Sequence, residues 1–444
     1  MKYIYGLNIS GQSVIKYYYF NNIPFVAWDD NKDIRSFIES NYKNILLIHP
    51  QALDCSKISE VFVSPGISLK NDVLEIFNVN KVILYRDLEL YSRLINSQKI
   101  IAVTGTNGKS TTVKLIGDMI NSNGLDCFVG GNLGVPLIDF INNKILSNYH
   151  VIELSSFQLE AAPSFQSYIS ILLNISDDHL DRYSSIKEYA NTKEKIIQKK
   201  INSFSIISLD DDFCKEVYNN NINNNNIIPI STSEPISKGI YLFDNVIYDN
   251  FFEKKEINLK YLSNSLNGQF NYQNILATYA TNKILNLNLN VFLSTVKNFK
   301  GLPHRFEYIF ENEKMLVINN RKATNFDSAI KTIKNFDNVF LIIGGRTKNN
   351  NFSIFKKVKN NISRCFVIGE STDLIFDQIS DLFLSFKNFT LEKAIEQIFI
   401  ELKNFESKVT IILAPACSSF DQFINFEQRG EKFKEIIMKK IHLS

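Results

Sequence analysis

The sequence has few cysteines, no long apolar stretch and almost no excess of one charge. Its five cysteines are scattered over 444 residues without the paired spacing of a zinc site or a disulfide framework, so we expect them to be reduced and mostly structural. No run approaches the roughly 18 uncharged apolar residues of a membrane-spanning helix, and the first residues lack the apolar core of a secretory signal. Lys and Arg number 49 against 46 Asp and Glu, and the resulting net charge of +3 is too small to indicate a polyanion-binding surface. We therefore expect a cytoplasmic protein that neither enters a membrane nor binds nucleic acid.

The length predicts about three domains, and the first of them alternates short strands with helices. Tyr3–Leu7 and Pro24–Trp28 have the apolar pattern of strands. Asp29, the first of two aspartates after the second strand, follows Gly6 by 29 − 6 = 23 residues. This is the Rossmann spacing for an acid that holds a ribose or a base. The glycine pattern is incomplete, so a Rossmann-like domain with ordinary turns is the alternative.

Two more strands are predicted in this first domain, over Ile45–Ile48 and Val61–Val63. The second of them runs into Ser64-Pro65-Gly66, a turn at the carboxyl end of a strand. Ligands of open α/β sheets bind at such ends, so this turn is a candidate binding element.

A phosphate-binding loop is predicted in the second domain. The buried-strand pattern Lys99–Val103 leads into Thr104–Thr112, whose order Thr-Gly-Thr-Asn-Gly-Lys-Ser-Thr-Thr precedes an amphipathic helix. Such an arrangement presents backbone N–H groups and a helix N-terminus to phosphates. Val103 stands where the consensus has its first glycine, so the loop is a variant. An ordinary strand-to-helix turn is the alternative.

A carboxylate follows the next apolar strand pattern. Glu153 comes directly after Val151-Ile152 and could supply an oxygen ligand to a magnesium ion held by Ser110. The alternative is that Glu153 is a solvated residue at the end of its strand.

A polar run then follows the apolar segment Ile169–Ile175. It contains His179, and Lys193 comes 193 − 179 = 14 residues later in a helix predicted over Lys187–Lys199. The alternatives are a solvated loop for His179 and an ordinary surface position for Lys193.

Asn271 and Asn274 share one face at the start of another predicted helix. Two amides in this position could hold a planar ring such as adenine, and they could equally cap the helix. Both interpretations stay open from the sequence.

A third unit begins near Gly301–Arg305 and again alternates strands with helices. Its predicted strands are Met315–Ile318, Val339–Ile343, Cys365–Ile368 and Val409–Leu413. Polar loops of small residues follow three of these strands, which predicts a second ligand-binding edge.

Taken together, these motifs resemble the ATP-dependent Mur ligases of peptidoglycan synthesis over nearly the whole chain. The segments that carry the resemblance are Thr104–Thr112, Gly131–Gly134, Glu153–Glu160, His179–Tyr183, Gly301–Glu307, Lys322–Asn325 and Pro415–Gly430. The last segment is the longest, and it resembles the D-glutamate-adding branch of the family rather than the sister ligases.

The resemblance implies an α/β protein with the three-domain Mur ligase architecture. Residues 1–92 would form a Rossmann-like domain for the UDP substrate, residues 93–299 a central P-loop ATPase domain, and residues 300–444 a Rossmann-like domain that binds the incoming amino acid and closes over ATP. In the implied reaction, ATP phosphorylates the carboxylate of UDP-N-acetylmuramoyl-L-alanine. The amine of D-glutamate then attacks the acyl phosphate to give an amide, ADP and phosphate. The resemblance further implies a monomer.

The family's functional residues carry over to matching positions of this sequence. The implied ATP-binding residues are Gly105, Thr106, Asn107, Gly108, Lys109, Ser110, Thr111, Asn271, Asn274, Arg305, Asn320 and Lys322. Those for the UDP substrate are Ser10, Asp29, Asp30, Asn132, Ser155 and Gln158, and those for D-glutamate are Thr324, Lys348, Ser419, Phe420 and Phe426. The implied catalytic residues are Lys109, Glu153, His179 and Lys193.

The resemblance also implies two magnesium ions. Ser110, Glu153, His179 and Lys193 would hold them. Lys193 would be carbamylated, because a free ammonium, with a pKa near 10.4, would repel a metal ion.

Three positions depart from the family's pattern. Asn320-Arg321 replaces an Asp-Ser pair, Phe270 replaces a histidine, and Arg346-Thr347 stands where many members carry an aspartate. The alternatives are a sister ligase for another amino acid, a folylpolyglutamate synthetase-like enzyme, a generic P-loop kinase, and a nucleotide-binding scaffold without turnover.

Overall fold

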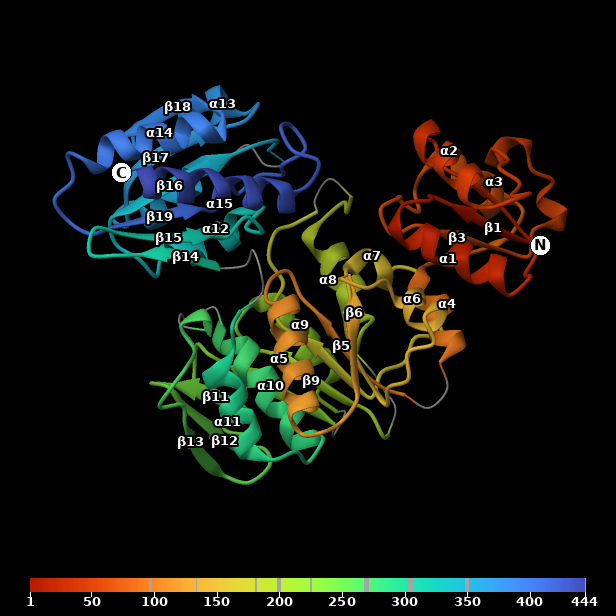
Figure 1. Ribbon diagram of the computed structural model, residues 1–444. Coiled ribbons are helices and arrows are strands. Elements are labelled where there is room, and N and C mark those ends of the chain that lie inside the picture. Colours follow the sequence, from red (N-terminus) through yellow and green to blue (C-terminus); the bar gives the residue numbers. More distant parts are fainter. Residues whose placement is uncertain are drawn as a thin grey trace. The chain divides into compact units, whose positions relative to one another are not determined.

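The computed structural model describes residues 1–95, 98–132, 134–179, 182–197, 201–223, 226–266, 271–301, 307–347 and 351–443. Within them the chain forms three β-sheets with helices between the strands, as Figure 1 shows. The chain divides into two compact units. The first comprises Met1–Tyr261 with Asn271–Lys297, and the second Leu262–Phe270 with Asn298–Ser444. The predicted α/β class is confirmed.

The first sheet consists of parallel strands in the order β2-β1-β3-β4. Its strands are β1 (Lys2–Tyr5), β2 (Phe25–Trp28), β3 (Glu60–Val63) and β4 (Ile83–Tyr85). Its helices are α1 (Ile9–Phe20), α2 (Lys32–Asn41), α3 (Glu75–Val79) and α4 (Asp87–Leu94). Tyr5 pairs with both Trp28 and Val63, so β1, β2 and β3 end at the same edge. The aspartates after β2 and the turn after β3 therefore share this edge.

The predicted strand over Ile45–Ile48 is wrong. The segment forms only one bridge, between Leu47 and Ala27. Leu46 is 56% exposed, so the segment lacks the two buried faces of an interior parallel strand.

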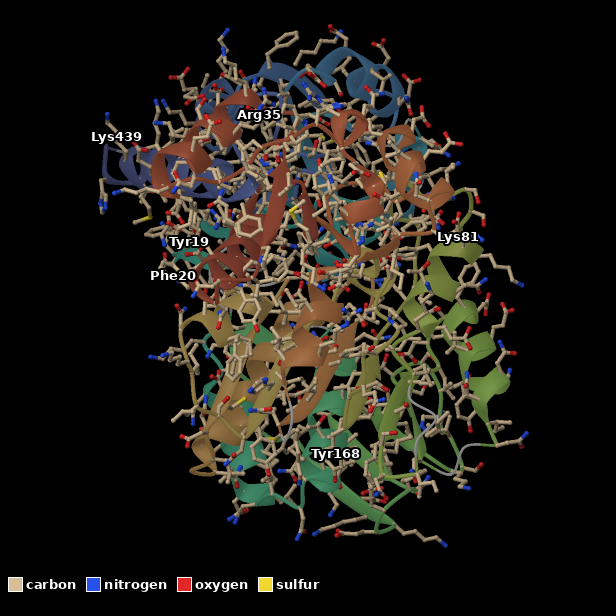
Figure 2. All side chains as sticks on the ribbon, turned by 90° about the vertical axis from the view of Figure 1, so that its right-hand side faces the viewer. Tyr19, Phe20, Arg35, Lys81, Tyr168 and Lys439 are labelled. Atoms are coloured by element: carbon tan, nitrogen blue, oxygen red, sulfur yellow. The ribbon has the colours of Figure 1, made fainter. Side chains whose placement is uncertain are left out.

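At the end of β2, the Arg35 guanidinium lies 4.2 Å from the centre of the Trp28 ring, and Figure 2 labels Arg35.

The second sheet has nine strands within the described ranges, in the order β13-β12-β11-β10-β9-β8-β5-β7-β6. The pairs between β6 and β11 are parallel, and β12 and β13 are added antiparallel. Its strands are β5 (Lys99–Thr104), β6 (Cys127–Gly131), β7 (Tyr149–Glu153), β8 (Ile169–Leu172), β9 (Phe204–Ser208), β10 (Ile227–Ser231), β11 (Ile240–Phe243), β12 (Val246–Asp249) and β13 (Lys255–Asn258). Its helices are α5 (Lys109–Ser122), α6 (Leu137–Asn142), α7 (Ser156–Leu159), α8 (Ile186–Glu194), α9 (Asp212–Asn221), α10 (Tyr272–Ile284) and α11 (Leu289–Asn298).

The apolar patterns around β5 form as predicted. Val103 is fully buried, as expected for a parallel strand covered on both faces. Val113, Ile116 and Ile120 recur at helical spacing in α5, and all three are buried. In the sheet, Val103 pairs with Glu153 of β7, and β8 lies on the other side of β5. The loop after β5 therefore lies between the ends of β7 and β8.

The third sheet has the order β14-β15-β19-β16-β17-β18, with β14 antiparallel and the others parallel. Its strands are β14 (Glu307–Glu311), β15 (Met315–Asn319), β16 (Val339–Gly344), β17 (Ile362–Ile368), β18 (Ser385–Phe389) and β19 (Val409–Leu413). Its helices are α12 (Phe326–Ile333), α13 (Thr372–Ile379), α14 (Leu391–Leu402) and α15 (Phe426–Leu443). Leu413 pairs with Asn319 and with Ile342, so the loops after β15, β16 and β19 meet at one edge.

Short 3-10 helices complete the described secondary structure. They are Pro50–Ala52, Cys55–Lys57, Asp72–Leu74, Asn264–Leu266 and Phe352–Val358. In the part of the chain that the structure describes, no helix has both the length and the apolar character needed to cross a membrane.

Candidate active site

The loop between β5 and α5 contains two glycines in a conformation that side chains rarely adopt. Gly105 has a φ of +153° and Gly108 a φ of +86°. A Cβ on Gly108 would lie 2.4 Å from Oδ1 of Asn274, so the loop packs closely against α10. The loop leads directly into the N-terminus of α5, where backbone N–H groups and the helix dipole favour an anion. The predicted strand-loop-helix arrangement is confirmed.

Two lysines converge on one carbonyl of this loop. Nζ of Lys109 donates to the carbonyls of Gly105 and Thr106, both at 2.8 Å. Nζ of Lys193 donates to the same Gly105 carbonyl at 2.9 Å and to Oγ1 of Thr104 at 3.3 Å. Lys193 is only 1% exposed. Its burial, and then the positive charge of Lys109, hold the pKa of Lys193 well below its usual value. Lys193 is therefore not the ordinary surface lysine of the alternative interpretation.

Glu153 connects the start of α5 with the residue that follows β6. Oγ of Ser110 donates to Oε2 of Glu153, and Nδ2 of Asn132 donates to Oε1 at 2.9 Å. Glu153 is fully buried, so the interpretation as a solvated strand end is wrong. The register of β5 and β7 explains this meeting, because it places Glu153 beside the strand that leads into Ser110.

The pair of Ser110 and Glu153 suits a magnesium ion. A hydroxyl and a carboxylate are oxygen ligands that Mg²⁺ accepts, and their existing hydrogen bond shows that both groups point to one place. Over the described ranges, no group of three or more His, Cys, Asp or Glu side chains gathers to hold a metal ion.

His179 follows β8 and has a φ of +55°, an uncommon conformation for a residue with a side chain. Its ring packs against Phe157 with 4.7 Å between ring centres, and Nε2 lies 3.7 Å from Oδ2 of Asp178. Backbone strain of this kind often accompanies a functional site. His179 is thus held in the loop that follows β8, with its ring packed on Phe157.

Asn271 and Asn274 form a buried pair. Nδ2 of Asn274 donates to Oδ1 of Asn271 at 3.0 Å, and Oδ1 of Asn274 accepts from the Thr112 hydroxyl at 3.0 Å. Neither amide caps the helix, because the N-cap position of α10 makes no side-chain capping bond. The helix-capping interpretation is therefore wrong, and the pair instead connects α10 to α5.

The two aspartates after β2 are held by their own domain. Oδ2 of Asp29 accepts from the Leu7 N–H at 2.6 Å, and Oδ1 accepts from the Asn31 N–H at 2.9 Å. Asp30 is exposed, and its Oδ2 accepts from the Tyr5 hydroxyl at 2.7 Å. Asp29 thus shapes the edge of the sheet, and Asp30 presents a carboxylate there.

Ser155 and Gln158 form a capping box at the start of α7. Nε2 of Gln158 also donates to Oδ2 of Asp87 at 3.2 Å, and Asp87 forms a side-chain hydrogen bond with Ser10. Burial raises the pKa of the Asp87 carboxyl. Three of the residues predicted for the UDP substrate are thereby linked through one buried acid that the sequence did not single out.

In the second unit, the predicted ATP residues Asn320 and Lys322 lie in the loop after β15. Nδ2 of Asn320 donates to Oγ1 of Thr332 at 2.7 Å, so this amide is used inside the unit. Nζ of Lys322 lies 5.7 Å from the centre of the Phe426 ring, and the Thr324 N–H donates to the Lys322 carbonyl at 2.8 Å. The structure therefore brings Lys322, Thr324 and Phe426 to one edge.

The loops after β16 and β19 meet at the same edge of this unit. Arg346 forms a bridge with Ser418, and its guanidinium bonds to Glu370 at 2.8 and 3.1 Å. Ser419 is buried and Phe420 is exposed. The predicted residues Arg305 and Lys348, and the departure at Phe270, lie outside the described residues.

Residues 103–282 match the protein family described as the Mur ligase middle domain. Over 97% of its length the chain is 34% identical to a UDP-N-acetylmuramoylalanine–D-glutamate ligase of Rickettsia bellii, of which it covers 95%. The chain belongs to the Mur ligase family. A ligase of the same name from Wolbachia pipientis is 32% identical, with 97% of this chain and 94% of that protein covered. The predicted resemblance to the D-glutamate-adding branch of the family is confirmed.

Solved structures agree with the Mur ligase fold. The UDP-N-acetylmuramate-alanine ligase of Thermotoga maritima has a TM-score of 0.60 at 16% identity, with 99% of both chains covered. A pseudomurein peptide ligase type C from Methanothermus fervidus has a TM-score of 0.59 at 16% identity, again over 99% of both chains. The three-domain Mur ligase architecture predicted from the sequence is confirmed.

Asn174 is a residue of this Mur ligase that sequence reasoning missed. Its Oδ1 accepts from the Asn107 N–H at 2.8 Å, and its Nδ2 donates to the Asn107 carbonyl at 3.1 Å. Nδ2 also donates to Oε1 of Gln273 at 2.9 Å, and Gln273 donates to Oδ2 of Asp210 at 2.8 Å. These hydrogen-bonded side chains connect Asn107 of the phosphate loop to Asn174, Gln273 and Asp210. The only sequence signal was an asparagine within the segment Ile169–Ile175, which is otherwise mostly apolar.

Proposed function

We propose that this chain joins D-glutamate to UDP-N-acetylmuramoyl-L-alanine at the expense of ATP, through an acyl phosphate. The observation that carries the proposal is the meeting of the phosphate loop, the buried Glu153 and the buried Lys193 at one edge of the second sheet. The choice of D-glutamate follows the printed names of the relatives and the sequence over Pro415–Gly430.

The phosphate loop would bind the triphosphate of ATP. Backbone N–H groups of the 105–111 segment and the N-terminus of α5 would face the phosphates, with the Lys109 ammonium as the mobile cation. Asn271 and Asn274 would lie close to adenine. Arg305, Asn320 and Lys322 complete the proposed set of ATP-binding residues.

Ser110 and Glu153 would hold one magnesium ion, and His179 with a carbamylated Lys193 a second. Such ions neutralise the charge of the triphosphate and of the transferred phosphoryl group. The chain's own part in the reaction is to orient the two reactants and to exclude water from the acyl phosphate.

Carbamylation of Lys193 is supported by its surroundings. Carbon dioxide reacts with a neutral amine, and the lowered pKa of Lys193 increases the neutral fraction. The neutral amine adds to carbon dioxide and releases a proton to water, and the resulting carbamate is an anion that the neighbouring Lys109 cation attracts. We expect a carbamate signal in ¹³C NMR after exchange with ¹³C-bicarbonate, and its loss in Lys193→Ala. A wild-type spectrum without this signal would contradict the modification.

The UDP substrate would bind at the edge of the first sheet and at the ends of β6 and β7, and D-glutamate at the edge of the third sheet. Ser10, Asp29, Asp30, Asn132, Ser155 and Gln158 would serve the UDP substrate, and Thr324, Lys348, Ser419, Phe420 and Phe426 would serve D-glutamate. The domain limits at residues 92 and 299, a monomeric state and a cytoplasmic location belong to the same proposal.

The test is phosphate release with ATP, magnesium, UDP-N-acetylmuramoyl-L-alanine and one of D-glutamate, L-glutamate, L-lysine or meso-diaminopimelate. We expect turnover with D-glutamate alone and its loss in Lys193→Ala. Turnover with a different amine would make the chain a sister ligase. ATP binding without turnover for every amine would make it a nucleotide-binding scaffold.

A further inference from the structure

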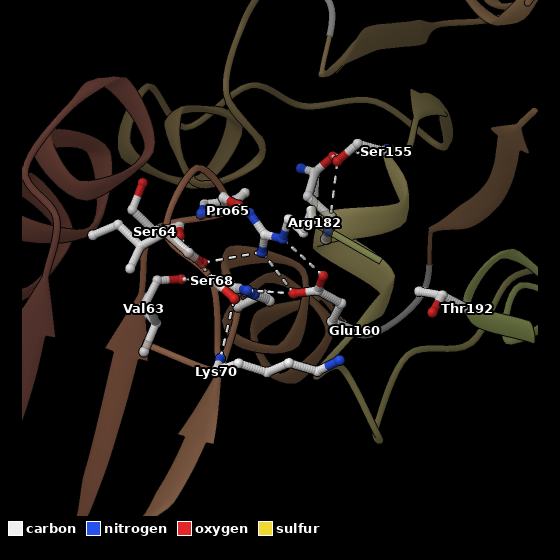
Figure 3. Close-up of polar contacts among 12 residues, drawn as sticks. Val63, Ser64, Pro65, Ser68, Lys70, Ser155, Glu160, Arg182 and Thr192 are labelled. Atoms are coloured by element: carbon white, nitrogen blue, oxygen red, sulfur yellow. Dashed lines mark hydrogen bonds and ion pairs between the residues drawn. The ribbon is translucent and has the colours of Figure 1, made fainter. Parts of the chain in front are cut away.

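Two arginines and one glutamate form a buried cluster between the first and second sheets. Arg86 lies between β4 and α4, Glu160 follows α7, and Arg182 comes three residues after His179. Oε2 of Glu160 accepts from Nη2 of Arg86 and from Nη2 of Arg182, the latter at 2.8 Å. Oε1 accepts from Nε of Arg182 at 3.1 Å. Figure 3 shows Arg182 between Pro65 of the turn that begins at Ser64 and Glu160, with its guanidinium pointing at Glu160.

The cluster is shielded from solvent. The side chains of Arg86, Glu160 and Arg182 are 0%, 14% and 9% exposed. A buried charge is tolerated only where it is paired, so each arginine depends on Glu160, which pairs with both. The three residues are therefore coupled through Glu160, unlike surface ion pairs, which contribute little.

Both arginines hold the backbone of the turn after β3, which we call the 64–67 turn (Ser64–Ile67). Arg86 Nη1 donates to the carbonyls of Val63 at 3.1 Å and Ser64 at 2.7 Å, and Arg182 donates to those of Pro65 at 2.8 Å and Ile67 at 3.0 Å. Four carbonyls in and next to the turn thus point towards the cluster (Figure 3).

The turn is open at Gly66. A Cβ on Gly66 would meet no described atom within 4 Å, whereas Ser64 and Ile67 pack against Gly6. The turn stands at the carboxyl end of a parallel strand, where ligands of open α/β sheets bind. Gly66 therefore keeps the turn accessible at the ligand-binding edge of the first sheet.

The same cluster reaches the candidate active site. The Arg182 guanidinium lies 3.9 Å from the centre of the Phe157 ring, and the rings of His179 and Tyr183 also pack on Phe157, with 4.7 and 6.1 Å between ring centres. The Tyr183 hydroxyl donates to Oε1 of Glu160 at 3.0 Å. The cluster is thus continuous from the first sheet's binding edge to the loop of His179.

We propose that Arg86 and Arg182, joined by Glu160, are positioning residues for the UDP substrate. They fix the position of the 64–67 turn relative to the phosphate loop. A substrate bound on the turn then presents its carboxylate to ATP. The inference rests on the proposed function, and it adds residues that this function does not otherwise require. It predicts a defect confined to the UDP substrate, since none of these side chains contacts the phosphate loop in the bonds described.

The test compares Arg182→Gln and Arg182→Lys with Lys70→Ala. Lys70 makes an exposed ion pair with Glu188 at 2.9 Å between the same two parts of the chain, so it is a matched control. Loss of the two turn bonds should raise KM for UDP-N-acetylmuramoyl-L-alanine by about tenfold or more, with KM for ATP within about twofold. Arg182→Lys should share the defect, because an ammonium cannot replace the forked geometry of a guanidinium. Lys70→Ala should leave both KM values within about twofold.

Hydrogen exchange separates this inference from the proposed function. In Arg182→Gln, and in Arg86→Gln if that variant folds, peptides over residues 60–67 should exchange faster than in the wild type, with or without substrate. Unchanged exchange there would overturn the inference even if D-glutamate turnover is normal. Faster exchange would support the inference that the two arginines hold the 64–67 turn, even if the wild type shows no turnover at all. An equal rise of KM for ATP and for the UDP substrate would also overturn it, because it would indicate a general loss of structure.

Discussion

Replacement of Asn174 by aspartate tests whether the hydrogen bonds of this side chain to the phosphate loop and to Gln273 support ATP binding. The change preserves the shape of the side chain and the acceptor for the Asn107 N–H. It removes two donations, to the Asn107 carbonyl at 3.1 Å and to Oε1 of Gln273 at 2.9 Å. Asn174 is only 7% exposed, so both acceptors lose their partner inside the protein. At about 1–2 kcal/mol for each, we expect a loss of about 2–4 kcal/mol in the free energy of unfolding.

The assay is urea unfolding together with KM for ATP. Because a displaced loop binds phosphates less well, KM for ATP should rise about tenfold, which corresponds to about 1.4 kcal/mol. Asn80→Asp is the control, since its amide makes a local bond to the Ile76 carbonyl on the surface and the change should cost less than about 0.5 kcal/mol. Equal unfolding midpoints and equal KM values in Asn174→Asp and Asn80→Asp would refute the reasoning.

Three further predictions address the loop, the metal site and the core. Gly108→Ala forces a Cβ to within 2.4 Å of Asn274 and should raise KM for ATP about tenfold, whereas Gly124→Ala, also at positive φ but in open space, should not; equal effects would contradict the packing argument. Glu153→Gln removes the buried carboxylate and should raise the magnesium concentration for half-maximal turnover about tenfold; an unchanged magnesium dependence would exclude Glu153 as a ligand. Burial lowers the pKa of His150 from 6.5 to about 4, so the unfolded chain takes up this proton first and the stability falls as the pH drops from 6.5 towards 4. Urea unfolding at pH 7 and pH 4.5 should show a smaller acid loss in His150→Gln, and an identical loss would show that His150 does not contribute.

Local patterns were enough to locate the phosphate loop and the apolar strand before it. Thr104–Thr112 is recognisable as a contiguous sequence motif, because the strand, the glycine loop and the helix each depend on residues that are neighbours in the sequence. The strand predicted over Ile45–Ile48 was wrong, because four apolar residues look the same whether the segment pairs fully with neighbouring strands or forms a single bridge.

Residues that act over long sequence separations were missed. Asn174 and Asn107 lie 67 positions apart, and Arg86 and Glu160 lie 74 positions apart. No spacing rule connects such pairs, because the path of the chain through the sheets decides which of them meet. Asn271 and Asn274 illustrate the same limit, since the sequence allowed both a helix cap and a binding pair.

The sequence by itself determined the family, the α/β class and the residue types available at each strand end. These follow from local hydrophobic periodicity and from motifs of contiguous residues. Only the tertiary structure decided that Lys193 is buried beside Lys109, that Glu153 is joined to Ser110, and that Arg86 and Arg182 hold the 64–67 turn. The physical reason is that burial and charge pairing depend on strand order and register, which bring distant residues together and are not written in any short stretch of the chain.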